Sequence, residues 1–363
     1  MSGRYTDFFL SNYCYGAKIS ARDDLAETLL AERFSGVVRI VYRGSVALQH
    51  VAGHTRAGSA WKVRADTRFA TASVTKMFTA VCIARLAEQG LCRLDQPASR
   101  YVPAANCFGD TATLDALLSH RAGLGDYIDD DAVLPFAAFP VEQLTSVDAF
   151  LPYIFKVDRH TPGRFRYSSA GYVLLGAVIE AVTKQAYPQA VRSCVIEPAG
   201  LCSTSFGRVD DPSPDYAWGY LENGEPNAQH LPPVGGPDGG IVTTVEDLES
   251  FFAWLRGDTA WGDSMKRTMW ERISETGVGE GYARGFDVMD IGGRPWVGHT
   301  GSDPGVSTRV MFDPASESNI TVLCNRGSIA FRVFRLVRRW LDADGWPPNH
   351  RLQRLCLKSS GLD

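Results

Sequence analysis

The chain has 363 residues, of which 45% are hydrophobic and 21% charged, the balance of a folded globular protein rather than a disordered or fibrous one. Its formal net charge of -4 provides no basic field, so neither nucleic acid nor a membrane surface is expected as a partner. No apolar run reaches the roughly 18 residues that cross a bilayer. The length, about 2.4 nominal domains, predicts one large two-lobed domain or two domains.

The beginning of the sequence and the cysteines favour a reducing compartment. Arg4, Asp7 and Lys18 interrupt the apolar positions of the first twenty residues, which therefore lack the apolar stretch of a signal peptide. The eight cysteines include no CxxC pair. We expect a cytoplasmic protein, with export and disulfide formation as the alternative.

The N-terminal part predicts a helix, a hairpin and a strand that leads into an apolar helix. Two β-rich runs are separated by Arg43-Gly44, which is typical of a hairpin turn. The apolar helix is expected to end before Gly90, a glycine in the position that terminates many helices. The expected elements span residues 23–34, 37–42, 46–51, 68–73 and 74–87.

The middle of the chain is expected to be helical and the C-terminal part mixed. Thr243-x-x-Glu246 is similar to a capping box and predicts a helix that continues to Leu255. Expected helices in the middle span 113–118, 141–155, 172–182 and 188–196. Strands are expected at 240–243, 286–291, 295–299, 308–312 and 319–324, followed by a final helix over 331–341.

This order of elements predicts an α+β fold. The turns between the strands are too short for crossover helices, so the sheet should be antiparallel and flanked by helices. Residues 1–90 and 236–363 are expected to form the lobe with the sheet, and residues 91–235 an inserted, mostly helical lobe. The active site is expected in the cleft between the lobes.

Several common chemistries lack their motifs. The sequence contains no HExxH, no GxxxxGK[ST] and no GxGxxG after a strand, which argues against zinc peptidases, P-loop proteins and dinucleotide enzymes. It contains no GxSxG elbow of the α/β-hydrolases. The seven histidines are scattered, without a metal-ligand cluster.

Ser73-x-x-Lys76 is the candidate catalytic pair. Residues three apart share a helix face, so the Lys76 amine can lie beside the Ser73 hydroxyl and act as its base if burial lowers the amine's pKa. The helix N-terminus would also direct the Ser73 backbone N–H at a substrate oxyanion. A surface lysine would show the same spacing. However, Lys76 is the only charged residue between Arg68 and Arg85, which favours a buried amine.

Two further segments fit this chemistry. Tyr167, in a Tyr-Ser-Ser segment before a predicted helix, is a candidate acid or base, although a core tyrosine is the alternative. The segment 299–302, with residues His299, Thr300, Gly301 and Ser302, is expected to end a strand, and its glycine would allow close approach to a ligand. The Ser302 N–H is the candidate second oxyanion donor.

Taken in order, these residues resemble the serine β-lactamase and penicillin-binding-protein superfamily. The likeness covers roughly residues 35 to 340 and is nearest to class C β-lactamases, family VIII carboxylesterases, D-aminopeptidases and soluble D,D-peptidases. Besides Ser73-x-x-Lys76, the motifs are LLSHRAGL at 117–124, FRYSSAGYVLLG at 165–176, GGIVTTVEDL at 239–248 and GHTG at 298–301.

The resemblance implies a two-lobe fold and an acyl-enzyme mechanism without metal or cofactor. It implies Ser73 as nucleophile, Lys76 as proton acceptor or electrostatic partner and Tyr167 as general base, with the Ser73 and Ser302 amides as oxyanion hole. Two positions depart from the family pattern. Ser169 replaces an asparagine, and His299 replaces a lysine whose fixed charge would bind a carboxylate.

Both departures point away from β-lactams. We therefore predict a serine hydrolase that acts through a Ser73 acyl-enzyme on small carboxylic esters or D-amino amides and peptides. An acyltransferase of the same superfamily and a penicillin-binding D,D-peptidase-like protein are the alternatives. A third hypothesis is a binding or sensing module that is acylated without turnover; Tyr167 argues against it, because deacylation needs a base.

Overall fold

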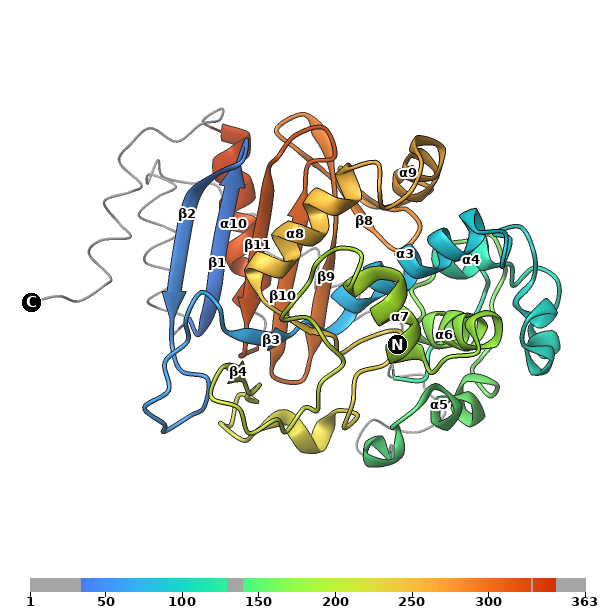
Figure 1. Cartoon of the computed structure of the whole chain (residues 1–363), viewed down its shortest axis with the longest axis horizontal. Coiled ribbons are helices and arrows are strands. Elements are labelled where there is room, and N and C mark those ends of the chain that lie inside the picture. Colours follow the sequence, from blue (N-terminus) through green and yellow to red (C-terminus); the bar gives the residue numbers. More distant parts are fainter. Residues whose placement is uncertain (1–33, 129–139, 328, 344–363) are drawn as a thin grey trace, which may run out of the picture.

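An eight-stranded sheet dominates the computed structural model, which describes residues 34–128, 140–327 and 329–343 (Figure 1). Its strand order is β2-β1-β11-β10-β9-β8-β7-β6, and every neighbouring pair is antiparallel. The predicted α+β class is confirmed. The strands are β1 (Gly36–Tyr42), β2 (Ser45–Ala52), β6 (Ser274–Gly277), β7 (Glu280–Tyr282), β8 (Asp287–Ile291), β9 (Arg294–Asp303), β10 (Val306–Phe312) and β11 (Asn319–Cys324).

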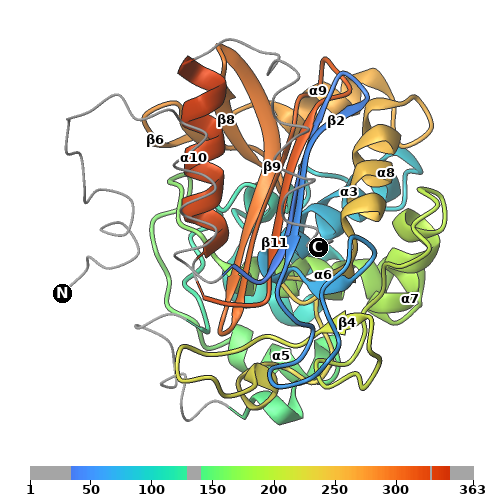
Figure 2. The same cartoon turned by 90° about the vertical axis from the view of Figure 1, so that its left-hand side faces the viewer.

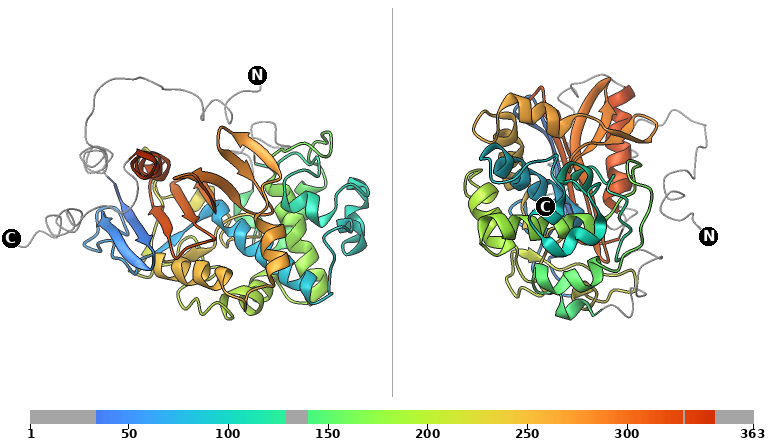
Figure 3. Two further views of the ribbon diagram at one scale, coloured as in Figure 1. Left: turned by 90° about the horizontal axis from the view of Figure 1, so that it is seen from above. Right: turned by 90° about the vertical axis from the view of Figure 1, so that its right-hand side faces the viewer.

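Helices cover both faces of this sheet. In Figures 2 and 3, α10 (Ile329–Ala343) lies on one face, and α8 (Val245–Arg256) lies on the other. Val37 of β1 packs into the core cluster shared with α3 (Thr75–Glu88) and α8, whereas its neighbour Val38 packs into the cluster shared with α10. Because successive side chains of a strand point to opposite faces, β1 buries apolar side chains on both faces, and Arg39 is the one charged residue in it.

The predicted hairpin is confirmed. β1 pairs with β2, and the turn residues Arg43 and Gly44 have φ angles of 48° and 78°. Positive φ at both central residues is the feature of the type I′ turn, whose twist suits two-residue hairpins. The glycine accepts this conformation without strain.

The remaining helices gather at the other end of the molecule from β1 and β2 (Figure 1). A small second sheet, in the order β4-β3-β5, lies beside them. No helix in the described ranges combines the length and the apolar character that a membrane span requires. These elements are β3 (Arg68–Ala70), α3 (Thr75–Glu88), α4 (Leu114–Leu118), α5 (Val147–Ile154), α6 (Ser169–Thr183), α7 (Tyr187–Val191), β4 (Tyr216–Ala217), β5 (Val242–Thr243) and α9 (Asp263–Trp270).

Some boundaries differ from the sequence-based expectations. The expected helix over 23–34 lies, except for Phe34, outside the described residues. The cap of α8 is Thr244, which accepts a hydrogen bond from the Asp247 N–H, one position after the expected capping box. The sequence analysis missed β6 and β7, because β6 is a mostly exposed edge strand without apolar alternation. The strand expected over 295–299 continues as β9 to Asp303, so that the segment 299–302 forms the last part of this strand, as expected.

Candidate active site

Ser73 lies on a sharp turn between β3 and α3. Ala72, just before it, is fully buried and has a φ of 50°, an uncommon conformation for a residue with a side chain. The Ala72 carbonyl accepts hydrogen bonds from the Thr75 hydroxyl at 2.7 Å and from the Gly240 N–H at 3.3 Å, which hold the strained turn in place. Such strain is typical of functional positions.

Lys76 lies one turn later, fully buried. Its Nζ donates to Ser73 Oγ at 3.0 Å, to Ser169 Oγ at 3.3 Å and to the Asp238 carbonyl at 2.6 Å. Burial lowers the pKa of the Lys76 amine, and the nearby carboxylates of Asp238, Asp126 and Asp303 partly oppose that effect. The predicted pairing of Ser73 with a buried lysine amine is therefore present in the structure.

Tyr167 completes a cluster around the nucleophile. Its hydroxyl shares a hydrogen bond with Ser73, and the Lys76 Nζ lies 5.0 Å from the centre of its ring. The residue is 37% exposed, yet its hydroxyl lies in a buried environment beside Ser73. Burial raises the pKa of the Tyr167 phenol well above its usual value, and the bond to Ser73 only partly offsets this, so the phenol keeps its proton at neutral pH.

The glycine-rich loop of residues 235–240 places the Asp238 carbonyl within hydrogen-bond distance of Lys76 Nζ. The loop closes on itself through a hydrogen bond from the Gly236 N–H to the Gly239 carbonyl at 2.8 Å. Two side chains of α3 form hydrogen bonds with the loop and the residue after it. Thr79 donates to the Pro237 carbonyl at 2.5 Å, and Thr75 accepts from the Ile241 N–H at 2.9 Å. The loop is thus held on the helix that carries Lys76.

Asp126 holds the start of α6, where Ser169 lies. Its carboxylate accepts hydrogen bonds from the Ser169 N–H at 2.7 Å and the Ala170 N–H at 3.3 Å, while Ser168 caps the helix. Burial raises the pKa of Asp126 to about 6, against these hydrogen bonds and Lys76. This arrangement directs the Ser169 hydroxyl to Lys76, although serine is shorter than the asparagine of the family pattern.

β9 runs against the turn that carries Ser73. A Cβ on Gly301 would lie 2.1 Å from the Thr71 carbonyl oxygen and 2.2 Å from Thr308 Oγ1, so only glycine fits. Ser302 follows on this stretch and is exposed, while Thr300 donates its N–H and hydroxyl to Asp287 at 3.0 and 2.9 Å. The close approach brings the 300–302 backbone to the nucleophile.

His299 does not face the cavity. It is 1% exposed, its Nδ1 lies 2.6 Å from the Thr300 carbonyl, and its Nε2 lies 3.0 Å from the Tyr282 hydroxyl. The carbonyl can only accept, so Nδ1 carries the hydrogen and Nε2 accepts from Tyr282. Burial lowers the pKa of His299 to about 4, which leaves the ring neutral. The structure thus shows His299 as a buried, neutral ring that is not among the residues lining the cavity.

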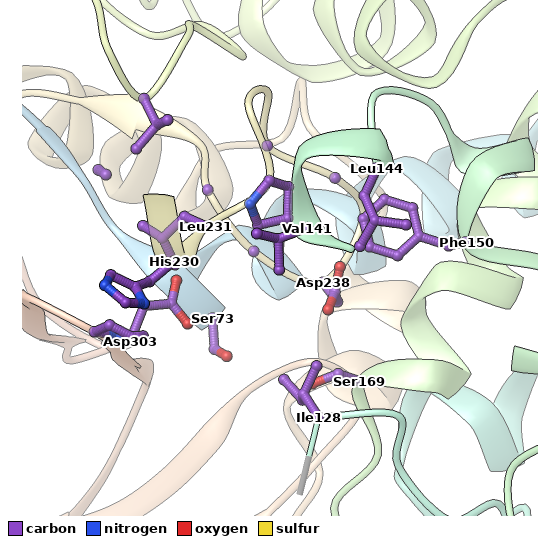
Figure 4. Close-up of a pocket in the computed structure, with 18 of the residues that line it drawn as sticks. Ser73, Ile128, Val141, Leu144, Phe150, Ser169, His230, Leu231, Asp238 and Asp303 are labelled. Carbon is purple, nitrogen blue, oxygen red and sulfur yellow. The ribbon is translucent and has the colours of Figure 1, made fainter. Parts of the chain in front are cut away.

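A cavity of about 820 Å³, including space open to solvent, lies over Ser73 (Figure 4). One part of its wall is apolar and includes Val141, Leu144 and Phe150. Its polar wall includes Ser169 and the carboxyl-bearing side chains Asp238 and Asp303. Among the described residues, no lysine or arginine lines it.

The structure therefore brings Ser73, Lys76, Tyr167 and Ser169 together, and places Gly301 and Ser302 beside them. Sequence reasoning missed Asp126, Asp238 and Asp303. Asp238 lies within the Gly-Gly-Pro-Asp-Gly-Gly segment at 235–240, and Asp303 begins an Asp-Pro-Gly turn. Both patterns are typical of tight loops, but their direction toward Ser73 is a tertiary feature.

The chain has relatives among known proteins and solved structures. The chain is 28% identical over 304 residues to Protein flp of Staphylococcus aureus (strain N315), covering 80% of this chain and 59% of that protein, so it spans about three fifths of its relative. A penicillin binding protein from Bacillus halodurans has a TM-score of 0.80 at 26% identity, covering 87% of this chain and 99% of that one.

A D-amino acid amidase from Ochrobactrum anthropi SV3, at a TM-score of 0.74 and 22% identity, shares the fold over 90% of this chain and 98% of its own. Residues 22–344 match the Beta-lactamase family, and the chain belongs to that family.

Proposed function

We propose that this member of the beta-lactamase family is a serine hydrolase that forms an acyl-enzyme at Ser73 with small carboxylic esters or D-amino amides and peptides and acts poorly on β-lactams. The observation that carries the proposal is the buried Lys76 amine 3.0 Å from Ser73 Oγ. A base within hydrogen-bond reach of a serine hydroxyl is the arrangement that activates a weak nucleophile.

The pKa directions divide the proton transfers between two residues. The pKa of Lys76 is lowered and that of Tyr167 is raised, so a neutral amine is the better acceptor and a neutral phenol the better donor. Lys76 then removes the Ser73 proton as Oγ bonds to the carbonyl carbon, and the electron pair moves to the carbonyl oxygen. The backbone N–H groups of Ser73 and Ser302 are the proposed donors to that oxyanion.

The second half of the reaction reverses these transfers. The bond to the leaving group breaks, and the leaving group takes the proton from Lys76 directly or through the Tyr167 hydroxyl. Water then attacks the acyl-enzyme with the same base, which releases the acid and restores the Ser73 hydroxyl. The chain's own side chains supply every proton transfer in this scheme.

The charge of the cavity supports the low activity predicted for β-lactams. A penicillin carries a carboxylate, and the carboxyls of Asp238 and Asp303 line the cavity near Ser73. Like charges at short range in a partly buried site disfavour binding. His299, buried and neutral, provides no compensating charge.

Intact-protein mass spectrometry after brief exposure to substrates tests the proposal. With p-nitrophenyl acetate or butyrate, we expect an acyl adduct or released nitrophenol that Ser73→Ala abolishes. The matched control Ser264→Ala removes an exposed serine of α9 and should retain wild-type behaviour. Ester turnover by Ser73→Ala within about tenfold of wild type, or a long-lived ampicillin adduct on Ser73, would contradict the proposal.

A further inference from the structure

The carboxyl of Asp303 is unusual among the described residues that line the cavity, because none of its contacts there is a hydrogen bond or an ion pair. It lines the cavity, and within the described part of the chain it has no hydrogen-bond partner. By contrast, Asp238 accepts a hydrogen bond from the Tyr127 hydroxyl at 2.6 Å. A half-buried carboxylate without a partner is costly, so its retention in a ligand cavity calls for a ligand group that satisfies it.

The position of Asp303 relates this carboxyl to the reacting serine. A Cβ on Gly239 would lie 3.8 Å from the Ala72 carbonyl carbon and 3.9 Å from Asp303 Oδ2. Gly239 therefore lies between Asp303 and the backbone of Ala72, the residue that precedes Ser73. In Figure 4, Asp303 and His230 lie on one side of Ser73, and Leu144 and Phe150 lie on the other.

The electrostatics of this end of the cavity favour a cation. Burial and the neighbouring charge of Asp238 raise the pKa of Asp303 to about 7, while Lys76 opposes them. Acylation requires a neutral Lys76 amine. A neutral amine no longer offsets the negative charge of the nearby Asp238 and Asp303 carboxylates. A bound ammonium would offset that charge instead, by a charge-assisted hydrogen bond.

We propose that Asp303 selects substrates with a protonated amino group close to the reacting carbonyl, so that the enzyme prefers aminoacyl or aminoalkyl esters and amides to neutral or carboxylate-bearing analogues. The inference rests on the proposed acyl-enzyme function and assigns its substrate class. The ammonium belongs either to the acyl group or to the leaving group, and the test has one arm for each.

Matched pairs of substrates measure this selection as a ratio of kcat/KM. In the acyl arm, each enantiomer of alanine p-nitrophenyl ester is compared with p-nitrophenyl propionate at pH 7. In the leaving-group arm, 2-aminoethyl propionate is compared with propyl propionate. We expect wild type to favour the cation in at least one arm, and Asp303→Asn to reduce that ratio by about tenfold to a hundredfold, the range of a hydrogen bond to a charged group.

Glu222→Gln is the matched control. It removes one negative charge from an exposed side chain outside the cavity and should keep the wild-type ratio. The absence of cation preference in both arms would overturn the inference. So would a preference that survives in Asp303→Asn, or an equal loss of neutral and cationic substrates in that variant.

A binding measurement separates this inference from the proposed function. Thermal shift of Ser73→Ala with butylammonium, butanol or butyrate requires no turnover. We expect stabilisation by butylammonium that exceeds both analogues and disappears in the Ser73→Ala, Asp303→Asn double variant. If no ester is turned over but this stabilisation is observed, the acyl-enzyme proposal fails and the cation site stands. Ester turnover without any ammonium effect gives the reverse result.

Discussion

The Lys76 amine is the group whose protonation should control the rate. Burial lowers its pKa from the ordinary 10.5, and only the neutral amine can accept the Ser73 proton. We expect kcat/KM for p-nitrophenyl butyrate to rise with pH to a plateau, with a midpoint below 10.5. Lys76→Ala should lower the plateau value of kcat/KM by about 10²–10⁴-fold and abolish its rise with pH.

Lys62→Ala is the control for that measurement, because Lys62 is exposed on the surface. It should reproduce the wild-type profile. A rise of the rate with pH that is the same in Lys76→Ala as in wild type would contradict a titrating Lys76.

Tyr167 contributes one hydroxyl within an aromatic cluster. Tyr167→Phe keeps the ring and removes only the hydroxyl beside Ser73, so we expect kcat to fall by about 10²-fold with little change in Tm. Tyr282→Phe is the matched comparison, because its buried hydroxyl bonds to His299 instead of Ser73. It should cost less than about threefold. An equally small loss in Tyr167→Phe would assign proton transfer to Lys76 alone.

At the scale of elements, contact between β9 and the serine turn aligns the two halves of the site. Gly301→Ala places a Cβ 2.1 Å from the Thr71 carbonyl oxygen, so the strand must move away. We expect a loss of about 1–3 kcal/mol in the free energy of unfolding, the usual cost of overpacking, together with a lower kcat. Chemical denaturation and ester kinetics measure the two effects.

Gly277→Ala is the control for this substitution. Gly277 lies in the edge strand β6, where a Cβ would approach no atom closer than 3.6 Å. Its effect on both quantities should be small. If Gly301→Ala retained wild-type stability and kcat, close packing between β9 and the turn would not be what positions the site.

Asp303 affects the stability of the whole molecule. Its pKa is about 7 in the folded chain against an ordinary 3.8, so between these values the folded state holds a proton that the unfolded state releases. Wild-type stability should therefore fall as pH rises through this window. Asp303→Asn never ionises, so its Tm should exceed that of wild type at pH 8 by on the order of a few °C, and the difference should shrink toward pH 4.

Calorimetry of wild type, Asp303→Asn and Glu222→Gln at pH 5 and pH 8 measures this effect. The Glu222 variant should show no comparable pH-dependent difference, because that side chain is exposed. A Tm difference for Asp303→Asn that is the same at both pH values would mean that the carboxyl is not held in an unfavourable environment.

The sequence by itself determined the features that depend on near neighbours in the chain. The turn at Arg43-Gly44, the apolar strands of the sheet and the pairing of Ser73 with Lys76 follow from local periodicity and from residues three apart on one helix face. The ordered motifs also predicted the family and the antiparallel fold. The boundaries of the two lobes stay a prediction.

Only the tertiary structure decided the surroundings of the nucleophile. The Asp238 carbonyl reaches Lys76 from 162 residues away, and Asp303 meets the cavity at the end of β9. His299 stands where the family pattern has a charged lysine. Packing against Tyr282 buries the His299 ring and keeps it neutral. Burial and charge depend on what the folded chain places next to a side chain, so no local pattern reveals them.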